Sequence, residues 1–121
     1  MVVTVLVVDD SMMVRRQVGR ALEDAGFAVL EAADGQEALD KMAAAAVGLV
    51  VCDVNMPRMD GLEFLERLGP AGVAATPVVM LTTEGQPALV QRAKAAGANG
   101  WIVKPFKAEL LVATIRKLAK A

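Results

Sequence analysis

Histidine is absent from this chain of 121 residues, and cysteine occurs once, at Cys52. Without histidine the chain lacks the usual general base, so any nucleophile must be a carboxylate, a hydroxyl or a lysine. A lone cysteine cannot form an internal disulfide or a cysteine metal cluster. Because Cys52 lies within an apolar run, we expect it to be a plain core residue.

Neither sign of charge dominates the sequence, which has 13 basic and 14 acidic residues and a net charge of -1. This balance gives no broad electrostatic attraction to nucleic acid or to an anionic membrane. Although 55% of the residues are hydrophobic, no apolar run approaches the roughly 18 residues that a membrane span requires. No basic and apolar leader precedes Val2. We therefore expect a cytoplasmic monomer that binds neither nucleic acid nor membrane.

Short apolar runs alternate with helical patterns five times along the chain. The expected strands cover residues 2–8, 27–31, 48–52, 77–81 and 100–103. Each is followed by a segment with apolar residues at helical spacing. This alternation predicts an α/β fold, a doubly wound five-stranded parallel sheet with five helices on its two faces. The length suits one domain, which we place at residues 1–121.

Several residues mark the expected helix ends. Ser11 is a candidate cap for the first helix, and Asp34, with Glu37 three residues later, is typical of the start of the second. Pro70 and Gly72 are expected to end the third helix.

Acidic residues follow two of the expected strands directly. Asp9 and Asp10 come after the first strand, and Asp53 comes after the third. Carboxylates at the carboxyl ends of parallel strands face the crevice where open α/β sheets bind ligands. Two carboxylates about 5 Å apart repel by about 3 kcal/mol at an effective dielectric constant of about 20, so three of them need a cation. A hard divalent metal such as Mg²⁺, held by oxygens, is the predicted cofactor.

Four motifs stand in order at successive strand ends: VVDDS, CDVNMPRMDG, MLTTEG and WIVKPF. With these motifs the chain resembles the response regulator receiver family over essentially its whole length, in the single-domain CheY-like form. The resemblance implies a flavodoxin-like sheet with strand order 2-1-3-4-5, an order that the residues themselves do not dictate.

The resemblance also implies roles for individual residues. It makes Asp53 the phosphoryl acceptor, with Lys104 and Thr82 binding the phosphoryl oxygens. The Mg²⁺ ligands would be Asp9, Asp10, Asp53 and the backbone carbonyl of Asn55. Phosphoryl transfer relies mainly on positioning and charge stabilisation, so these groups suffice without a histidine base.

Further positions concern switching and lifetime. Thr82 and Trp101 match the residues that move when a receiver is phosphorylated, and the bulk of an indole favours a Trp101 that stays partly outward. Asn55 and Glu84 match regulators with short-lived phosphorylation. The family also implies a cis peptide bond before Pro105.

The resemblance predicts a signalling module rather than an enzyme, since the chain would catalyse only its own phosphorylation and dephosphorylation. A separate histidine kinase would donate the phosphoryl group, and the modified surface would switch partner binding, with chemotaxis or motility as the expected setting. An acidic segment of the output protein is expected to dock on the face with Arg92, Lys94, Trp101 and Lys107.

Other interpretations stay open at this point. Taken singly, Asp9, Asp10 and Asp53 could be ordinary capping or turn acids, and Lys104 a solvated surface charge. A small phosphatase with an aspartyl-phosphate intermediate would need a second acid two residues after Asp53, where Asn55 stands. A flavin-binding module of flavodoxin type would need a phosphate cradle where two acids stand instead.

Overall fold

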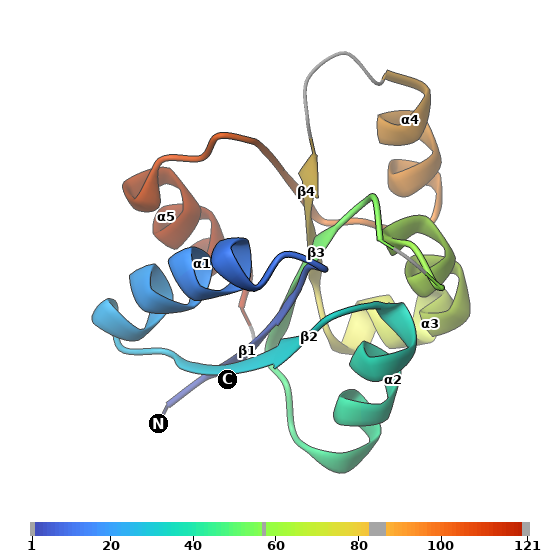
Figure 1. The fold of residues 1–121 in the computed structure, drawn as a ribbon. Helices are drawn as coiled ribbons and strands as arrows, with labels where there is room; N and C mark the ends of the chain where they lie inside the picture. The colour runs from blue at the N-terminus through green and yellow to red at the C-terminus, as the bar shows by residue number, and fades with distance from the viewer. Residues whose placement is uncertain (1, 57, 83–86, 120–121) are drawn as a thin grey trace.

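The computed structural model describes residues 2–56, 58–82 and 87–119. The described residues form one five-stranded sheet with helices on both sides (Figure 1). The strands are β1 (Thr4–Val8), β2 (Ala28–Ala32), β3 (Leu49–Asp53), β4 (Val78–Thr82) and β5 (Gly100–Val103). The helices are α1 (Met12–Asp24), α2 (Gly35–Ala44), α3 (Gly61–Ala75), α4 (Pro87–Ala95) and α5 (Ala108–Leu118).

All neighbouring strands pair in parallel, in the order β2-β1-β3-β4-β5. The predicted fold class and strand order are therefore confirmed. β2, β3 and β4 begin and end one residue later than expected, β1 begins two residues later, and β5 has the expected bounds. The bounds differ because strand pairing sets them, whereas the expected ranges follow apolar character alone.

Alternating side chains along the strands bury two separate faces of the sheet. Leu6 and Val8 of β1 pack with residues of α2, α3 and α4, whereas Val5 and Val7 pack with residues of α1 and α5. In Figure 1 the helices α1 and α5 accordingly lie on one side of the sheet and α2, α3 and α4 on the other. Cys52 is fully buried in the first of these clusters, as predicted.

The expected helix starts are present. The Ser11 hydroxyl accepts a hydrogen bond from the Val14 N–H, and an Asp34 carboxylate oxygen accepts one from the Glu37 N–H. A side chain that accepts in this way satisfies an N–H group that the helix itself leaves unpaired.

The predicted end of the third helix is wrong. Gly69 does interrupt α3 with a left-handed backbone, at φ 68° and ψ 175°, but helical structure resumes and continues to Ala75. Proline suits the first position of a helix because its fixed φ is helical and its missing N–H would have no partner there. Pro70 therefore begins a second helical segment instead of ending the first.

Among the described residues, no helix combines the length and the apolar character that a bilayer crossing requires.

Candidate phosphorylation and metal site

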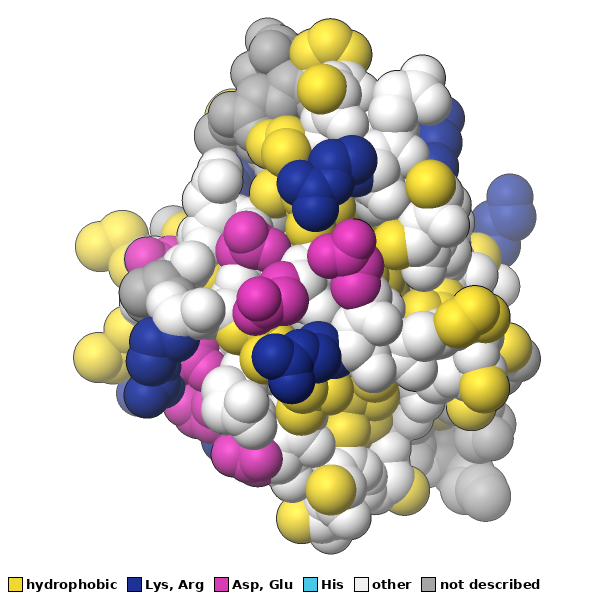
Figure 2. All heavy atoms as spheres, turned by 90° about the vertical axis from the view of Figure 1, so that its right-hand side faces the viewer, with side chains coloured by type: hydrophobic (Ala, Val, Ile, Leu, Met, Phe, Trp, Pro, Cys, Tyr) yellow, Lys and Arg dark blue, Asp and Glu magenta, His cyan; other side chains and the backbone are white. Residues whose placement is uncertain are grey.

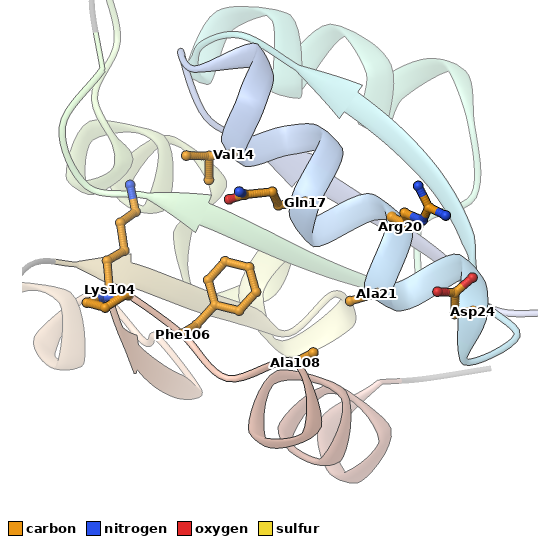
Figure 3. Close-up of a pocket in the computed structure, with 9 residues that line it drawn as sticks. Val14, Gln17, Arg20, Ala21, Asp24, Lys104, Phe106 and Ala108 are labelled. Atoms are coloured by element: carbon orange, nitrogen blue, oxygen red, sulfur yellow. The ribbon is translucent and has the colours of Figure 1, made fainter.

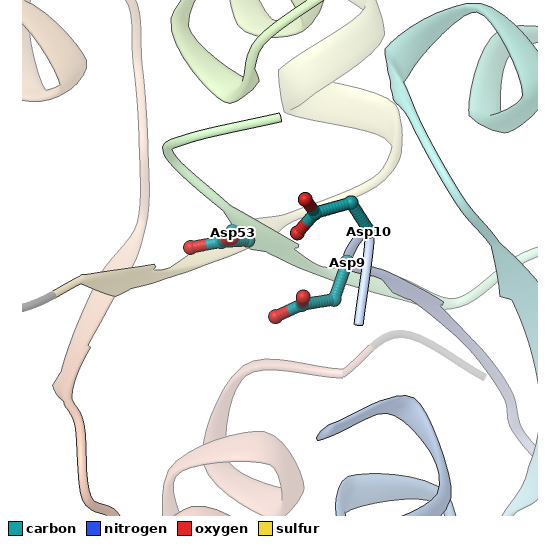
Figure 4. Close-up of side chains that lie close together, drawn as sticks. All are labelled: Asp9, Asp10 and Asp53. Atoms are coloured by element: carbon teal, nitrogen blue, oxygen red, sulfur yellow. The ribbon is translucent and has the colours of Figure 1, made fainter. Parts of the chain in front are cut away.

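Three carboxylates meet at the carboxyl edge of the sheet. Asp53 is the last residue of β3, and Asp9 and Asp10 directly follow β1, the strand beside it. One oxygen from each of the three side chains lies within 4.8 Å of the other two (Figure 4). Asp9 and Asp53 are buried, at 1% and 6% exposure, whereas Asp10 is exposed. The structure thus brings together the acids that the sequence predicted to converge.

Asp9 is held in place from several directions. Its N–H donates to the Ala32 carbonyl at 3.1 Å, and its own carbonyl accepts from the Arg15 guanidinium at 2.6 Å. Its Oδ1 accepts from the Ser11 N–H at 2.9 Å. These bonds fix both the backbone and the carboxylate at the start of α1, so Asp9 presents a defined orientation to the site.

Lys104 supplies the cation of the site. Its Nζ lies 3.1 Å from Asp9 Oδ2 and 3.1 Å from Asp53 Oδ1, and it donates to both. The Lys104 N–H donates to the Thr82 carbonyl at 2.7 Å, which extends the β4–β5 pairing to this residue. The peptide bond between Lys104 and Pro105 is cis, as expected.

The ionisation of two groups is shifted by this arrangement. Burial first, and then the neighbouring charge of Asp9, raise the pKa of Asp53, although Lys104 opposes both effects. Burial alone would lower the pKa of Lys104, but the charges of Asp53 and Asp9 outweigh it and raise that pKa above its usual value. Lys104 therefore stays charged, while the charge on Asp53 is disfavoured.

The donor set fits a hard divalent cation. One ammonium among three carboxylates leaves an excess of negative charge, and two carboxylates up to 4.8 Å apart repel by about 3 kcal/mol at an effective dielectric constant of about 20. Carboxylate oxygens are the ligands that Mg²⁺ prefers, and exposed Asp10 leaves the site open to solvent. Figure 2 shows acidic side chains gathered near the middle of one face, between two groups of Lys and Arg side chains.

The other predicted residues surround this centre. Thr82 is buried at the carboxyl end of β4, next to β3. Asn55 is exposed in the segment after β3, whereas Glu84 lies outside the described residues. Trp101 is half-buried on β5 and packs against the cluster on the α2, α3 and α4 side.

The three basic residues assigned to the output face are exposed. Arg92 and Lys94 belong to the last turn of α4, and Lys107 directly precedes α5 without a capping hydrogen bond from its side chain. The Arg92 Nη2 atom also lies 3.7 Å from Oε1 of Glu66 in α3.

A groove of about 880 Å³ opens beside Lys104, between α1 and the segment that joins β5 to α5 (Figure 3). Val14 and Gln17 of α1 line one side, and Phe106 lines the other. One side of the Lys104 side chain therefore faces an open groove with a largely apolar lining.

Sequence reasoning missed two basic residues with buried or half-buried partners, of which Arg15 contacts the site directly. Arg15 bonds the Asp9 carbonyl and pairs with Glu31 at 2.9 Å, and Arg58 bonds Asp34. Their partners are distant in the sequence or are backbone atoms, so spacing gave no signal. The sequence pattern indicates Asp34 only as a helix cap.

Comparison with known proteins identifies the family. The model of the response regulator receiver domain matches residues 5–116. Transcriptional regulatory protein PdtaR of Mycobacterium tuberculosis is 37% identical over 112 residues, which are 92% of this chain and 54% of that protein. Response regulator MprA of Mycolicibacterium vanbaalenii is 40% identical over 120 residues, 99% of this chain and 52% of that protein. The chain thus spans about half the length of these curated relatives.

The structure is also similar to a chemotaxis protein of nearly the same size. CheY4 of Vibrio cholerae superposes with a TM-score of 0.90 at 44% identity, covering 98% of this chain and 99% of that one. The matched domain covers nearly all of this chain and contains the acids, Thr82 and Lys104 described above. The chain belongs to the response regulator receiver domain family, the signalling modules of two-component systems.

Proposed function

We propose that this chain is a phosphorylation-activated switch that accepts a phosphoryl group on Asp53 from a histidine kinase. The observation that carries the proposal is the contact of Lys104 Nζ with both Asp53 Oδ1 and Asp9 Oδ2, at 3.1 Å each, within a cluster of three carboxylates. In the transfer, the phosphorus–nitrogen bond of the donor phosphohistidine breaks as a phosphorus–oxygen bond to Asp53 forms. The product is an acyl phosphate on Asp53.

Each surrounding residue has a proposed part in this step. Asp9, Asp10, Asp53 and the Asn55 carbonyl would hold Mg²⁺. When bound, the ion neutralises the carboxylates and the charge that develops on the phosphoryl oxygens. Lys104, which donates a hydrogen bond to Asp53, would transfer that bond to a phosphoryl oxygen. Thr82, at the end of the adjacent strand, would donate a hydrogen bond from its hydroxyl to a second phosphoryl oxygen.

The proposal has a direct test in the mass of the intact protein. Treatment with acetyl phosphate and Mg²⁺ should add about 80 Da, the mass of one phosphoryl group, to the wild type. The Asp53→Asn variant, or wild type treated with a metal chelator present, should gain nothing. An equal gain in Asp53→Asn would exclude Asp53 as the acceptor.

We propose a short phosphoryl lifetime, set by Asn55 and Glu84. The polar side chain of Asn55 is exposed two residues after the acceptor, so water has access to this side of the site. Radiolabelled acyl phosphate should therefore decay rapidly in Mg²⁺, and a lifetime of many hours would contradict this part of the proposal.

We propose that phosphorylation changes the face formed by Arg92, Lys94, Trp101 and Lys107, and that an acidic segment of an output protein binds there. The exposure of the three basic residues and the half-burial of Trp101 support this choice. The double variant Lys94→Glu/Lys107→Glu should lose phosphorylation-dependent binding. Unchanged binding in that variant would rule this face out.

The proposed output is a change of binding partner. The likeness to CheY4 supports chemotaxis or motility as the setting, and the described elements, which run from residue 4 to residue 118, support one receiver domain across residues 1–121. We propose that the protein works as a monomer in the cytoplasm. The family assignment favours this signalling function over a phosphatase or a flavin-binding module.

A further inference from the structure

The segment that follows Asp53 leads from β3 back to α3. Its two ends are tied together, because the Gly61 N–H donates to the Val54 carbonyl at 2.9 Å. The Val54 N–H in turn donates to the Leu81 carbonyl of β4 at 3.2 Å. These bonds fix where the segment begins and ends. Asn55 directly follows Val54, so its backbone is held on one side by these bonds, and what holds the other side of the segment bears on where its carbonyl points.

The far side of the segment is held by Arg58. The Arg58 Nε donates to Asp34 Oδ2 at 2.8 Å, and Nη2 of the same guanidinium donates to the same oxygen. Asp34 is almost completely buried, at 2% exposure. The Arg58 side chain is itself 72% exposed, but its hydrogen bonds end on a buried carboxylate, so they are less screened by solvent than an ion pair between two exposed groups. We call this contact the Asp34–Arg58 clasp.

The other oxygen of Asp34 anchors the clasp to helix α2. Asp34 Oδ1 accepts from the Glu37 N–H at 2.9 Å and so caps the helix. The Glu37 N–H and the Arg58 guanidinium together lower the pKa of Asp34, against the effect of burial. The carboxylate therefore joins a rigid helix end to the segment after β3.

A second link lies beside the first. The Gly35 N–H donates to the Met59 carbonyl at 3.0 Å, and Met59 is buried. A Cβ on Gly35 would lie 2.7 Å from Met59 Cγ, so this approach requires glycine. The N-terminal end of α2 thus contacts the segment through two consecutive residues, Asp34 and Gly35.

The backbone of Arg58 is strained. Its φ of 62° makes it the one non-glycine residue with positive φ in the described part of the chain. For a residue with a Cβ this conformation costs about 1 to 2 kcal/mol. Such strain persists only where surrounding contacts hold it, and these contacts are the clasp and the Met59–Gly35 bond.

We propose that the Asp34–Arg58 clasp is a positioning element of the metal site, which acts by holding the segment that carries Asn55 against the end of α2. Arg58 and Asp34 touch neither the phosphoryl group nor the metal. Their effect on Asn55 is indirect, through the positions that the clasp gives to Arg58 and Met59. This inference rests on the proposed function, since it assigns to Asn55 a Mg²⁺ ligand carbonyl.

The test compares Mg²⁺ binding with fold stability in the same variants. Arg58→Gln removes the charge but keeps a long polar side chain on the same strained backbone. Its dissociation constant for Mg²⁺, measured by calorimetric titration, should rise about tenfold, the lower end of the loss seen when a group that orients a metal ligand is removed. Arg58→Lys keeps the charge and should recover part of the affinity.

Asp34→Asn provides an independent variant, because asparagine still caps α2 but offers no charge to Arg58. Its affinity should fall as in Arg58→Gln, and the double variant should be no worse than either single one. Arg16→Gln removes another ion pair of an exposed arginine, with Glu31, and should bind Mg²⁺ as the wild type does. Thermal midpoints measured with a chelator report the purely structural effect.

The outcomes separate the two proposals. If Arg58→Gln and Asp34→Asn bind Mg²⁺ like the wild type, whatever their thermal midpoints, the clasp is structural only and the inference is overturned while the proposed function stands. If the wild type itself does not bind Mg²⁺, the proposed metal site fails and the inference fails with it. A tenfold loss that Arg58→Lys partly recovers supports the inference.

Discussion

Asp53 carries a charge that the folded protein disfavours. The carboxyl is buried beside Asp9, and both features raise its pKa, while Lys104 compensates only in part. A group that is costly to ionise in the fold gains from any cation that reaches it. The unfavourable ionisation of Asp53 lowers the stability of the metal-free fold. The same unfavourable charge favours binding of a metal ion and addition of a phosphoryl group.

The raised pKa of Asp53 predicts how stability depends on pH. Below the ordinary carboxyl pKa of 3.8, Asp53 is protonated in both the folded and unfolded states and costs nothing. As the pH rises from that value through the raised pKa of the folded state, the unfolded state ionises more readily and stability is lost. The loss is complete at neutral pH, where the carboxyl is ionised in both states.

The Asp53→Asn variant cannot ionise, so without metal it should unfold at a higher temperature than the wild type at neutral pH. The difference in unfolding temperature between the variant and the wild type should disappear as the pH falls toward 3.8. Asp60→Asn is the control, since Asp60 is exposed and asparagine can still cap α3 by accepting from the Glu63 N–H. If the wild type is more stable than Asp53→Asn at neutral pH with a chelator present, ionised Asp53 does not destabilise the metal-free fold and the prediction is wrong.

At this scale the sequence predicted the acids and the lysine but not their supports. Asp9, Asp10, Asp53 and Lys104 follow apolar runs, and the ends of parallel strands meet at one edge. Arg58 follows no such rule. Its contact with Asp34 depends on a left-handed backbone and on a carboxylate in another element, which only the folded chain brings together.

At the scale of elements, local chemistry predicted helix starts better than helix ends. Ser11 and Asp34 cap their helices through bonds to residues three positions later, so the signal is contained in a few residues. The Gly69–Pro70 pair carries two meanings, since it can end a helix or start the next. Here Val73, beyond the break, is buried in the core, and this packing holds the second helical segment in place.

Gly61, the first residue of α3, provides a test at this scale. A Cβ there would meet the Asp53 carbonyl oxygen and the end of Met80, closer than real atoms approach. We expect Gly61→Ala to lower the free energy of unfolding by about 1 to 3 kcal/mol, because the backbone at Asp53 must shift. Urea denaturation measures this directly.

Gly19→Ala is the matched control within α1. A Cβ on Gly19 would lie 3.4 Å from Val29 Cγ1, an ordinary contact. Alanine also favours helix by up to about 1 kcal/mol over glycine, so this variant should be neutral or more stable. If Gly61→Ala proved as stable as Gly19→Ala, the close contact at Asp53 would not constrain the fold.

At the scale of the whole molecule, the sheet connects the site with a surface beyond it. Thr82 and Trp101 lie on paired strands, since Met80 pairs with Trp101 and Thr82 with Val103. The alternation of strands and helices predicted this sheet from the sequence pattern alone. The strand order came from the family resemblance, because apolar strands carry little information about which neighbours they choose.

Trp101 is the single tryptophan of the chain, so its fluorescence reports on this connection without interference. If Thr82 moves toward the phosphoryl group, the packing of the half-buried indole should change, and its emission should shift in intensity or wavelength on phosphorylation. Thr82→Val lacks the hydroxyl but keeps the shape. It should accept the phosphoryl group with little change in emission. Constant emission from fully phosphorylated wild type would exclude Trp101 from the switch.

The position of the acyl phosphate is the most direct test of the central claim. After reaction with acetyl phosphate and Mg²⁺, reduction with borohydride converts the modified aspartate into homoserine, which peptide mass spectrometry can locate. We predict that homoserine replaces Asp53 and no other carboxylate. Homoserine at Asp9, at Asp10 or at no position would contradict the assignment of Asp53 as the phosphoryl acceptor.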